Sequence, residues 1–219
     1  KDEPQLELFL LDNFYPAGDE HVLVHEVTGR VVPQGGIPID VGAVVNNVFT
    51  LALLADAVQD KPFTHKYVTV TGEVNRPCVC EVPVGVSIGE VIETYGRGVK
   101  ISDYKIVLGG PMMGNCLADL SQPVLKNNNA VLAFSKKWAH IPKSTNCIHC
   151  GRCVNACPLG LAAKDIVVAF NKGNVELLNQ LHADLCMSCG TCSFVCPAKR
   201  PLTPSIALAK IMMKNGGKK

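Results

Sequence analysis

Apolar and polar residues alternate over residues 68–72, Val-Thr-Val-Thr-Gly, and a period of two is typical of a half-buried strand. Residues 80–83 are expected to pair with this strand as a hairpin. Ser87 followed by Glu90 is the pattern of a capping box, which predicts a helix that ends at Gly96 as its C′ residue. Strand, strand and helix in this order predict a small β-grasp-like module.

Three further segments have the apolar spacing of helices. They are residues 47–58, 161–170 and 175–181. The first is closed by a proline shortly after it, because the residue before proline avoids the helical basin. Asn174 precedes the third segment and is its expected N-cap.

The remaining periodic segments are two strands and a C-terminal helix. Short apolar runs predict strands at residues 106–108 and 130–134. For the tail helix, Thr203 is the expected N-cap and Pro204 the first helical residue, where its missing N–H costs nothing. The helix is expected to end at residues 216–217, a pair of glycines.

Together these elements predict an α+β chain of three parts. Residues 1–62 mix short apolar runs with turns. Residues 63–135 hold the β-grasp-like module with flanking strands. Residues 136–219 begin with a linker and continue as an α-helical, cysteine-rich domain.

Charge and hydropathy exclude several classes of function. Among 219 residues, 21 are Lys or Arg and 19 are Asp or Glu, and a net charge of +2 is too balanced for nucleic-acid binding. The most apolar stretch, residues 41–58, is interrupted by Asn46, Asn47 and Asp56, so no segment reaches the roughly 18 apolar residues of a membrane-spanning helix. No signal peptide is visible, and the missing initial Met indicates a fragment or a processed chain.

Eight of the eleven cysteines form two repeats of one spacing. The repeats are Cys147-x₂-Cys150-x₂-Cys153-x₃-Cys157-Pro158 and Cys186-x₂-Cys189-x₂-Cys192-x₃-Cys196-Pro197. Bacterial ferredoxins hold [4Fe–4S] clusters with this run, and in two-cluster ferredoxins the fourth cysteine ligates the other cluster. The predicted ligands of one cluster are Cys147, Cys150, Cys153 and Cys196. Those of the other are Cys186, Cys189, Cys192 and Cys157.

Other uses of these cysteines fit the spacing less well. Zinc also binds pairs of C-x₂-C, but a zinc site takes four ligands, and here a third evenly spaced cysteine and a Cys-Pro occur twice. Disulfides are disfavoured because cysteines this close in sequence cannot all pair without strain. Gly151 and Gly190 follow the second cysteine of each repeat, where a side chain is expected to crowd the loop against a cluster. The pattern indicates a metal or redox cofactor in a reducing compartment.

The other candidate residues allow two interpretations each. Cys78 and Cys80 share one face of a predicted strand and are either a metal site or small apolar fillers. Cys116 is expected to be structural, and Trp138 and His140 are expected to be packing and surface residues.

Basic residues are interspersed with the cysteines. If eight thiolates make this region acidic, these residues are compensating charges around buried clusters; otherwise they are ordinary solvated side chains. They are Arg152, Lys164, Lys199 and Arg200.

The chain resembles the RnfC family, the peripheral iron–sulfur and flavin proteins of the Rnf ferredoxin:NAD oxidoreductases. The marks are residues 109–114, Gly-Gly-Pro-Met-Met-Gly, the double cysteine motif, and Pro201-Leu202 opening the tail helix. The resemblance implies that residues 1–62 are the later part of an α/β flavin/NADH domain shared with the flavin subunit of respiratory complex I. It also implies that residues 63–135 hold a ligand-binding β-grasp module.

By the same resemblance, Glu20, Asn46, Asn47 and Thr50 face FMN or NADH. The glycine-rich loops with which the family cradles phosphate are not found in this sequence. FMN is therefore expected in the full-length protein and is not expected to be retained by this chain.

The resemblance implies a function in electron transfer. Two [4Fe–4S] clusters would pass electrons between NAD(H) or flavin and ferredoxin, within an ion-translocating complex at the cytoplasmic face of the bacterial inner membrane. The partners are then the other subunits of that membrane redox complex, and this chain alone is expected to be an electron carrier. Two alternatives stay open. One is a soluble relative that feeds another reductase, of the cobalamin- or proline-reductase type, and the other is a binding scaffold with structural metal.

Overall fold

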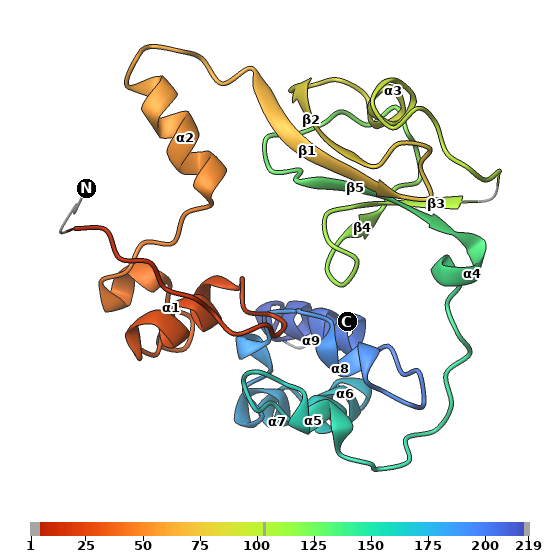
Figure 1. Ribbon diagram of the computed structural model, residues 1–219. Coiled ribbons are helices and arrows are strands. Elements are labelled where there is room, and N and C mark those ends of the chain that lie inside the picture. The colour runs from red at the N-terminus through yellow and green to blue at the C-terminus, as the bar shows by residue number, and fades with distance from the viewer. Residues whose placement is uncertain (1–4, 103, 217–219) are drawn as a thin grey trace. The chain divides into compact units, whose positions relative to one another are not determined.

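The computed structural model describes residues 5–102 and 104–216 (Figure 1). The chain divides into two compact units. The cysteine unit contains the residues up to 50 and those from 145 onward, and the sheet unit contains residues 51–144. Helices and one mixed sheet confirm the α+β class.

The sheet unit is built on five strands in the order β2-β1-β5-β3-β4. The strands are β1 (His65–Gly72), β2 (Cys78–Pro83), β3 (Tyr104–Leu108), β4 (Asn115–Cys116) and β5 (Ala130–Ser135). β1 pairs with β5 in parallel, and the other pairings are antiparallel. The hairpin predicted from the alternating pattern is therefore confirmed, and so are the strands at 106–108 and 130–134.

Helix α3 (Ile88–Thr94) follows the hairpin and packs on the sheet, which completes the β-grasp arrangement (Figure 1). Ser87 is its N-cap, since the Ser87 hydroxyl oxygen accepts a hydrogen bond from the Glu90 N–H at 3.1 Å. The apolar core under the helix includes one cysteine. Its buried members are Val68, Val70, Val74, Cys80, Val82, Ile88, Val91, Ile92, Ile106, Val124, Val131 and Ala133.

Gly96 stands at the C′ position of α3, as predicted, but for a different reason. The residues with left-handed φ come after it, at Arg97 (56°) and Gly98 (76°). A Cβ on Gly96 would lie 2.6 Å from the Ile92 carbonyl oxygen and 3.3 Å from Cγ1 of Val70. Glycine is needed here because a Cβ would clash with the Ile92 carbonyl of the preceding turn and press on Val70 of strand β1.

One lysine is buried in the sheet unit. The Lys66 side chain is 1% exposed, and its Nζ donates to the Lys126 carbonyl at 2.8 Å and to Oδ1 of Asn129 at 3.2 Å. Burial lowers the pKa of the Lys66 amine. Its two oxygen partners satisfy the amine and tie strand β1 to the turn before β5.

The cysteine unit is helical. Its helices and 3₁₀ turns are α1 (Glu20–Thr28), η1 (Pro38–Val41), α5 (Arg152–Asn155), α6 (Ala163–Asn171), α7 (Val175–Gln180), η2 (Ala183–Leu185), α8 (Thr191–Phe194) and α9 (Leu202–Lys214). The predicted helices at 161–170 and 175–181 are confirmed, and the Asn174 side chain accepts from the Leu177 N–H as the expected cap.

Two helices lie at or beyond the limits of the cysteine unit. α2 (Val48–Ala57) crosses the division between the units and confirms the helix predicted at 47–58, and none of its residues is buried. The short helix α4 (Lys136–Ala139) follows β5 in the segment expected to be a linker. In the described part of the chain, no helix is both long and apolar enough to cross a membrane.

The start of α9 differs from the prediction. Pro201 is the N-cap residue, and Thr203 lies inside the first turn. The Thr203 N–H donates to the Ser193 hydroxyl oxygen at 2.8 Å, so a side chain of α8 satisfies it. The helix therefore begins before Thr203, and Pro204 is its third residue. At the other end Gly216 has a left-handed φ of 63°, and Gly217 lies outside the described residues.

Candidate metal centres

The two cysteine repeats fold in the same way. The residue before the second cysteine has a left-handed φ in each, 56° at His149 and 58° at Ser188. The glycine after that cysteine is also left-handed, with φ of 73° at Gly151 and 88° at Gly190. A Cβ on Gly151 meets no protein atom within 4 Å, so the left-handed backbone is sufficient reason for glycine there, and crowding against a cluster stays a prediction.

The fourth cysteine of each repeat lies beyond a short helix. After Cys157 and Cys196 the chain turns at a left-handed residue, Gly160 (φ 64°) in the first repeat and Lys199 (φ 52°) in the second. The short helix, α5 or α8, separates the fourth cysteine from its own loop, and the turn then leads the chain on to the next helix.

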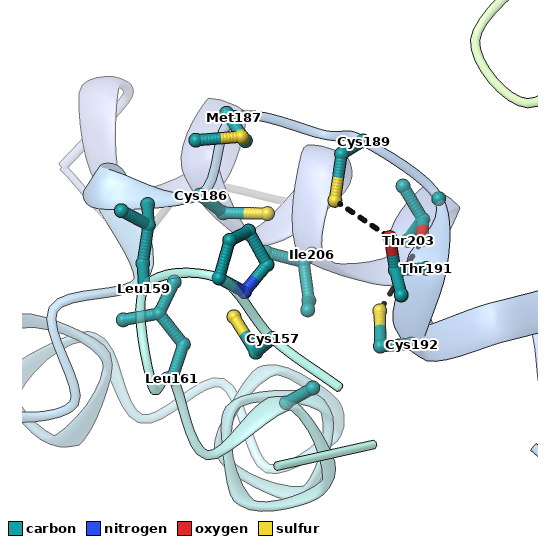
Figure 2. A pocket seen from close by; sticks show the side chains of 13 residues that line it. Cys157, Leu159, Leu161, Cys186, Met187, Cys189, Thr191, Cys192, Thr203 and Ile206 are labelled. Atoms are coloured by element: carbon teal, nitrogen blue, oxygen red, sulfur yellow. Dashed lines mark hydrogen bonds between the residues drawn. The ribbon is translucent and has the colours of Figure 1, made fainter. Parts of the chain in front are cut away.

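Each fourth cysteine joins the loop of the other repeat. Site 1 is the cavity lined by Cys147, Cys150, Cys153 and Cys196. Site 2 is the cavity lined by Cys157, Cys186, Cys189 and Cys192. In site 2 the four sulfurs point into the same space, which is walled by Leu161 and Ile206 (Figure 2). The structure thus brings together the two sets of four cysteines that the spacing groups, and their ligation of a cluster stays a prediction.

Hydrogen bonds surround the sulfurs of site 2. Each cysteine of its loop has a donor or a hydroxyl nearby: the Ser188 N–H at 3.4 Å from the Cys186 sulfur, Thr191 Oγ1 at 3.3 Å from the Cys189 sulfur, and Thr203 Oγ1 at 3.4 Å from the Cys192 sulfur. Burial raises the pKa of Cys186 and Cys192 above that of a free thiol. Metal binding therefore has to release protons that these two thiols hold when no metal is bound.

Two distant side chains hold the site 2 loop through its backbone. The Tyr15 hydroxyl donates to the Cys189 carbonyl at 2.6 Å, and the Lys210 amine donates to the Cys186 carbonyl at 2.8 Å. Burial, followed by the charges of Cys189 and Asp19, raises the pKa of Tyr15. Sequence reasoning missed both residues, since Tyr15 lies 174 positions from its partner and nothing local marks it.

Site 1 contains an exposed cysteine and is bordered by charge. Cys150 is exposed, and Arg152, Lys164 and Arg200 line the cavity together with Asp165. The Lys164 amine lies 2.8 Å from Oδ1 of Asp165. Asp165, by hydrogen bond and charge, and then the Cys147 and Cys153 sulfurs raise the pKa of Lys164. Of the four basic residues singled out in the sequence, three thus border site 1.

A larger cavity of about 970 Å³ lies next to site 2 within the cysteine unit. Its walls include Cys157, Cys186 and residues of the N-terminal segment, with Glu20 among them. The other three flavin candidates, Asn46, Asn47 and Thr50, are exposed and are not among its lining residues. Oδ1 of Asn47 instead accepts from the Phe49 N–H at 2.9 Å, as a turn at the start of α2.

The remaining cysteines lie in the sheet unit. Cys80 is buried, and burial and the neighbouring Cys78 raise its pKa to about 11, so it is a neutral thiol near pH 7. Cys78 packs against the same apolar core. Both therefore act as apolar fillers. Cys116 is exposed on β4, so it does not contribute to the core.

Trp138 and His140 are exposed, as expected for surface residues. In the described residues no group of three or more Cys, His, Asp or Glu side chains converges on a position for a single metal ion.

Three family models match separate parts of the chain. The FMN-binding domain of Nuo51 matches residues 1–56, the SLBB domain residues 67–115, and the 4Fe–4S dicluster domain residues 144–199. The last match supports iron–sulfur clusters in the cysteine unit.

Curated relatives match over most of the chain. The RnfC protein of the Na⁺-translocating ferredoxin:NAD⁺ oxidoreductase complex of Acetobacterium woodii is 37% identical over 95% of this chain and 47% of the relative. Its counterpart in the proton-translocating complex of Clostridium ljungdahlii is 40% identical over 67% of this chain and 32% of the relative. The cobalamin reductase PduS of Citrobacter freundii is 35% identical over 88% of this chain and 47% of the relative. The chain thus spans about half, or less, of the length of these relatives.

One solved structure shares the fold. A chain of the crystal structure of NAD⁺-reducing [NiFe]-hydrogenase in the H₂-reduced state matches 90% of this chain and 39% of its own length, with a TM-score of 0.51 and 20% identity. At this identity the likeness concerns the fold alone.

Proposed function

Since the chain is a relative of the RnfC proteins of ion-translocating ferredoxin:NAD⁺ oxidoreductase complexes, we propose that it transfers electrons through two [4Fe–4S] clusters. The observation that carries the proposal is the crossing of the fourth cysteines. Each cavity receives three cysteines from one loop and one from the other repeat. This is the ligand arrangement of two-cluster ferredoxins, whose cubanes each need four thiolates.

The cysteine sets fit such a cluster chemically. Iron–sulfur clusters are ligated by thiolates, and four cysteines line each cavity. A cluster therefore needs no carboxylate or histidine ligand at either site. A cluster bound here supplies a one-electron centre. The residues around it, Thr191, Thr203 and the Ser188 N–H, donate to or lie near the sulfurs, and hydrogen bonds of this kind set the reduction potential.

In the whole assembly, the electrons would move between NAD(H) or a flavin and ferredoxin. The partners would be the other subunits of a membrane redox complex, with this chain bound peripherally at the cytoplasmic membrane face. The relatives named as members of such complexes support this setting. On this proposal residues 1–62 belong to the flavin/NADH part, residues 63–135 to the β-grasp part, and residues 136–219 to the cluster part.

FMN is a separate question for this chain. The match of residues 1–56 to an FMN-binding domain supports a flavin in the whole protein. In this chain Asn46, Asn47 and Thr50 are exposed, and only Glu20 borders the large cavity. We propose that these 219 residues do not retain FMN by themselves. Flavin fluorescence after gel filtration tests this, and one FMN per chain would contradict it.

A second setting is supported by the relatives named cobalamin reductase, which match 88% of this chain. In that setting the same clusters would feed a soluble reductase. The two settings differ in partner, so affinity capture from membranes and from the soluble fraction separates them.

The crossed ligation is tested by two alanine variants and one control. After anaerobic reconstitution the protein is expected to hold about eight irons and eight sulfides, as two cubanes require. Cys196→Ala should damage the cluster at Cys147, Cys150 and Cys153, and Cys157→Ala should damage the other. EPR of the reduced protein and iron content measure this. Cys116→Ala, at an exposed thiol outside both cavities, should change neither.

Two results contradict the proposal. If the protein holds zinc and no acid-labile sulfide, the proposed redox function is wrong and the metal sites are structural. If Cys157→Ala damages the cluster bound by the cysteines of its own loop, the crossed ligation is wrong, and the electron-transfer proposal still stands.

A further inference from the structure

We infer that the face around site 1 is the docking surface for an acidic protein that carries its own one-electron centre. The docking surface consists of Ile148, Cys150 and Arg152, which line site 1, and of Lys199, an exposed residue between the lining residues Ala198 and Arg200 in the chain. The inference rests on the proposed electron-transfer function. It adds that the cluster at site 1 is the one that exchanges electrons with a soluble protein, and that this protein is acidic.

Exposure distinguishes the two sites. At site 1 the loop between the first two cysteines reaches the surface, where Ile148 is 64% exposed and Cys150 is exposed as well. At site 2 Cys189 and Cys192 are only 8% and 9% exposed. Because electron tunnelling slows steeply with distance, a partner protein reaches the cluster of site 1 more closely than that of site 2.

Charge distinguishes them further. The site 1 cavity is lined by three basic side chains, Arg152, Lys164 and Arg200, and by one carboxylate, Asp165, which pairs with Lys164. No charged residue lines the site 2 cavity among the described residues. The larger cavity beside site 2 is bordered instead by four carboxylates, Asp19, Glu20, Glu26 and Asp184, and by one lysine, Lys210, so carboxylates outnumber lysines there. An acidic partner is therefore attracted more strongly to the surface at site 1 than to the surface at the larger cavity.

The negative charge of the clusters does not cancel the positive charge of this surface. Lys164 and Arg200 are half-buried beside the sulfurs and offset the thiolates. Arg152 and Lys199 are exposed, and within residues 5–102 and 104–216 no carboxylate pairs with either. Both flank the cysteines directly, Arg152 before Cys153 and Lys199 three residues after Cys196. They leave positive charge where a partner would make contact.

The apolar side chain in this surface fits the same role. Ile148 is an exposed branched residue between two ligand cysteines of the candidate site. Electron-transfer complexes are small and short-lived, and an apolar contact within a charged rim is the composition of such interfaces. The charges speed the encounter, and the apolar contact holds the two centres together.

The test measures reduction of the reconstituted chain by a small acidic ferredoxin in stopped-flow experiments at low and high salt. Arg152→Glu and Lys199→Glu are each expected to slow the second-order rate at low salt, and the double variant about ten-fold or more. The loss should shrink at high salt, because screening removes the steering. Ile148→Ala should slow the reaction at both salt concentrations.

Lys214→Glu is the matched control, with the same charge change on an exposed lysine at the far end of α9, about 18 Å along the helix from Leu202. It is expected to change the rate less than two-fold. Iron and sulfide content shows that each variant holds its clusters. Reduced methyl viologen, a small cation that needs no docking, should reduce all variants at least as fast as the parent chain.

The outcomes separate the two proposals. If viologen reduces no cluster, electron transfer itself is wrong. If viologen reduces the clusters, the electron-transfer proposal stands. The docking proposal is then wrong if ferredoxin reduces the variants as fast as the parent chain, or if Lys214→Glu slows the reaction as much as the other variants do.

Discussion

The cores of the two units differ in the role of the cysteines that they contain. In the sheet unit, the buried cluster joins valines and isoleucines from the sheet and α3, with Cys80 among its members and Cys78 packed against it. In the cysteine unit, the buried cluster under α6 and α9 contains Cys192 and Cys196, and Cys153, Cys157 and Cys186 pack against it. The thiols of the sheet-unit core are apolar fillers, whereas those of the cysteine-unit core also line sites 1 and 2.

The difference bears on where each unit's stability comes from. Burial of apolar surface stabilises the sheet unit directly, and its hairpin and parallel β1–β5 pairing need no other component. Helices of four to nine residues, such as α5, α6, α7 and α8, are too short to be stable alone. We expect the clusters to hold them together, since each joins cysteines from both repeats.

Removal of iron is expected to give the largest effect. A strong chelator under oxidising conditions should unfold the helices α5–α9, because the clusters that join the two repeats are lost. The sheet unit should keep its strands. Hydrogen exchange measures both units in one sample: amides of α6 and α9 should lose protection while those of β1 and β5 keep it. Equal protection in both units after iron loss would contradict the comparison.

A matched pair of cavity variants gives the next largest effect. Ile92 in the sheet unit and Ile166 in the cysteine unit are 2% and 0% exposed. Replacement of either by Ala should cost about 2–5 kcal/mol, from lost burial and the cavity left behind.

The two variants should differ in what they do to the clusters. Ile92→Ala should lower the free energy of unfolding of the sheet unit in urea, with iron content unchanged. Ile166→Ala should instead lower the iron and sulfide retained after reconstitution, because its core and the metal sites are continuous. Iron loss in Ile92→Ala would show that the units are not independent. Full iron content in Ile166→Ala would show that the core of the cysteine unit does not support the metal sites.

The smallest expected effect is a pH dependence confined to the sheet unit. The folded-state pKa of Cys80 is raised to about 11, from 9.0 for an exposed thiol. The folded chain therefore holds this proton above pH 9 while the unfolded chain loses it. The stabilisation is present below pH 9 and is lost as the pH rises toward 11.

Between pH 8 and pH 10.5, urea unfolding should show a loss of about 1–2 kcal/mol from this group, allowing for solvent screening. Cys80→Val, which fills the same strand position without a proton to lose, should remove that part of the loss. Cys116→Val at the exposed thiol is the control and should leave it unchanged. The same pH slope in Cys80→Val and the parent chain would refute the assignment.

Much of this protein follows from the sequence, where the determining interactions are local. The alternation over 68–72, the Ser87 cap and the Asn174 cap each involve residues within a few positions, so their pattern predicted the elements that the structure shows. The cysteine spacing is also local within each repeat. Combined with the general rule for two-cluster ferredoxins, it predicted the two sets of cysteines that line sites 1 and 2.

Only the tertiary structure decided the contacts between segments far apart in the chain. The pair Thr203-Pro204 predicted Thr203 as the N-cap. In the structure Thr203 lies inside the helix, and its N–H donates to the hydroxyl of Ser193 on another helix. The sequence had no signal for Tyr15, whose hydroxyl reaches the Cys189 carbonyl, or for the unequal exposure and charge of two sites with the same spacing. These features depend on which surfaces pack together, and a sum of many weak non-local contacts leaves no short pattern in the sequence.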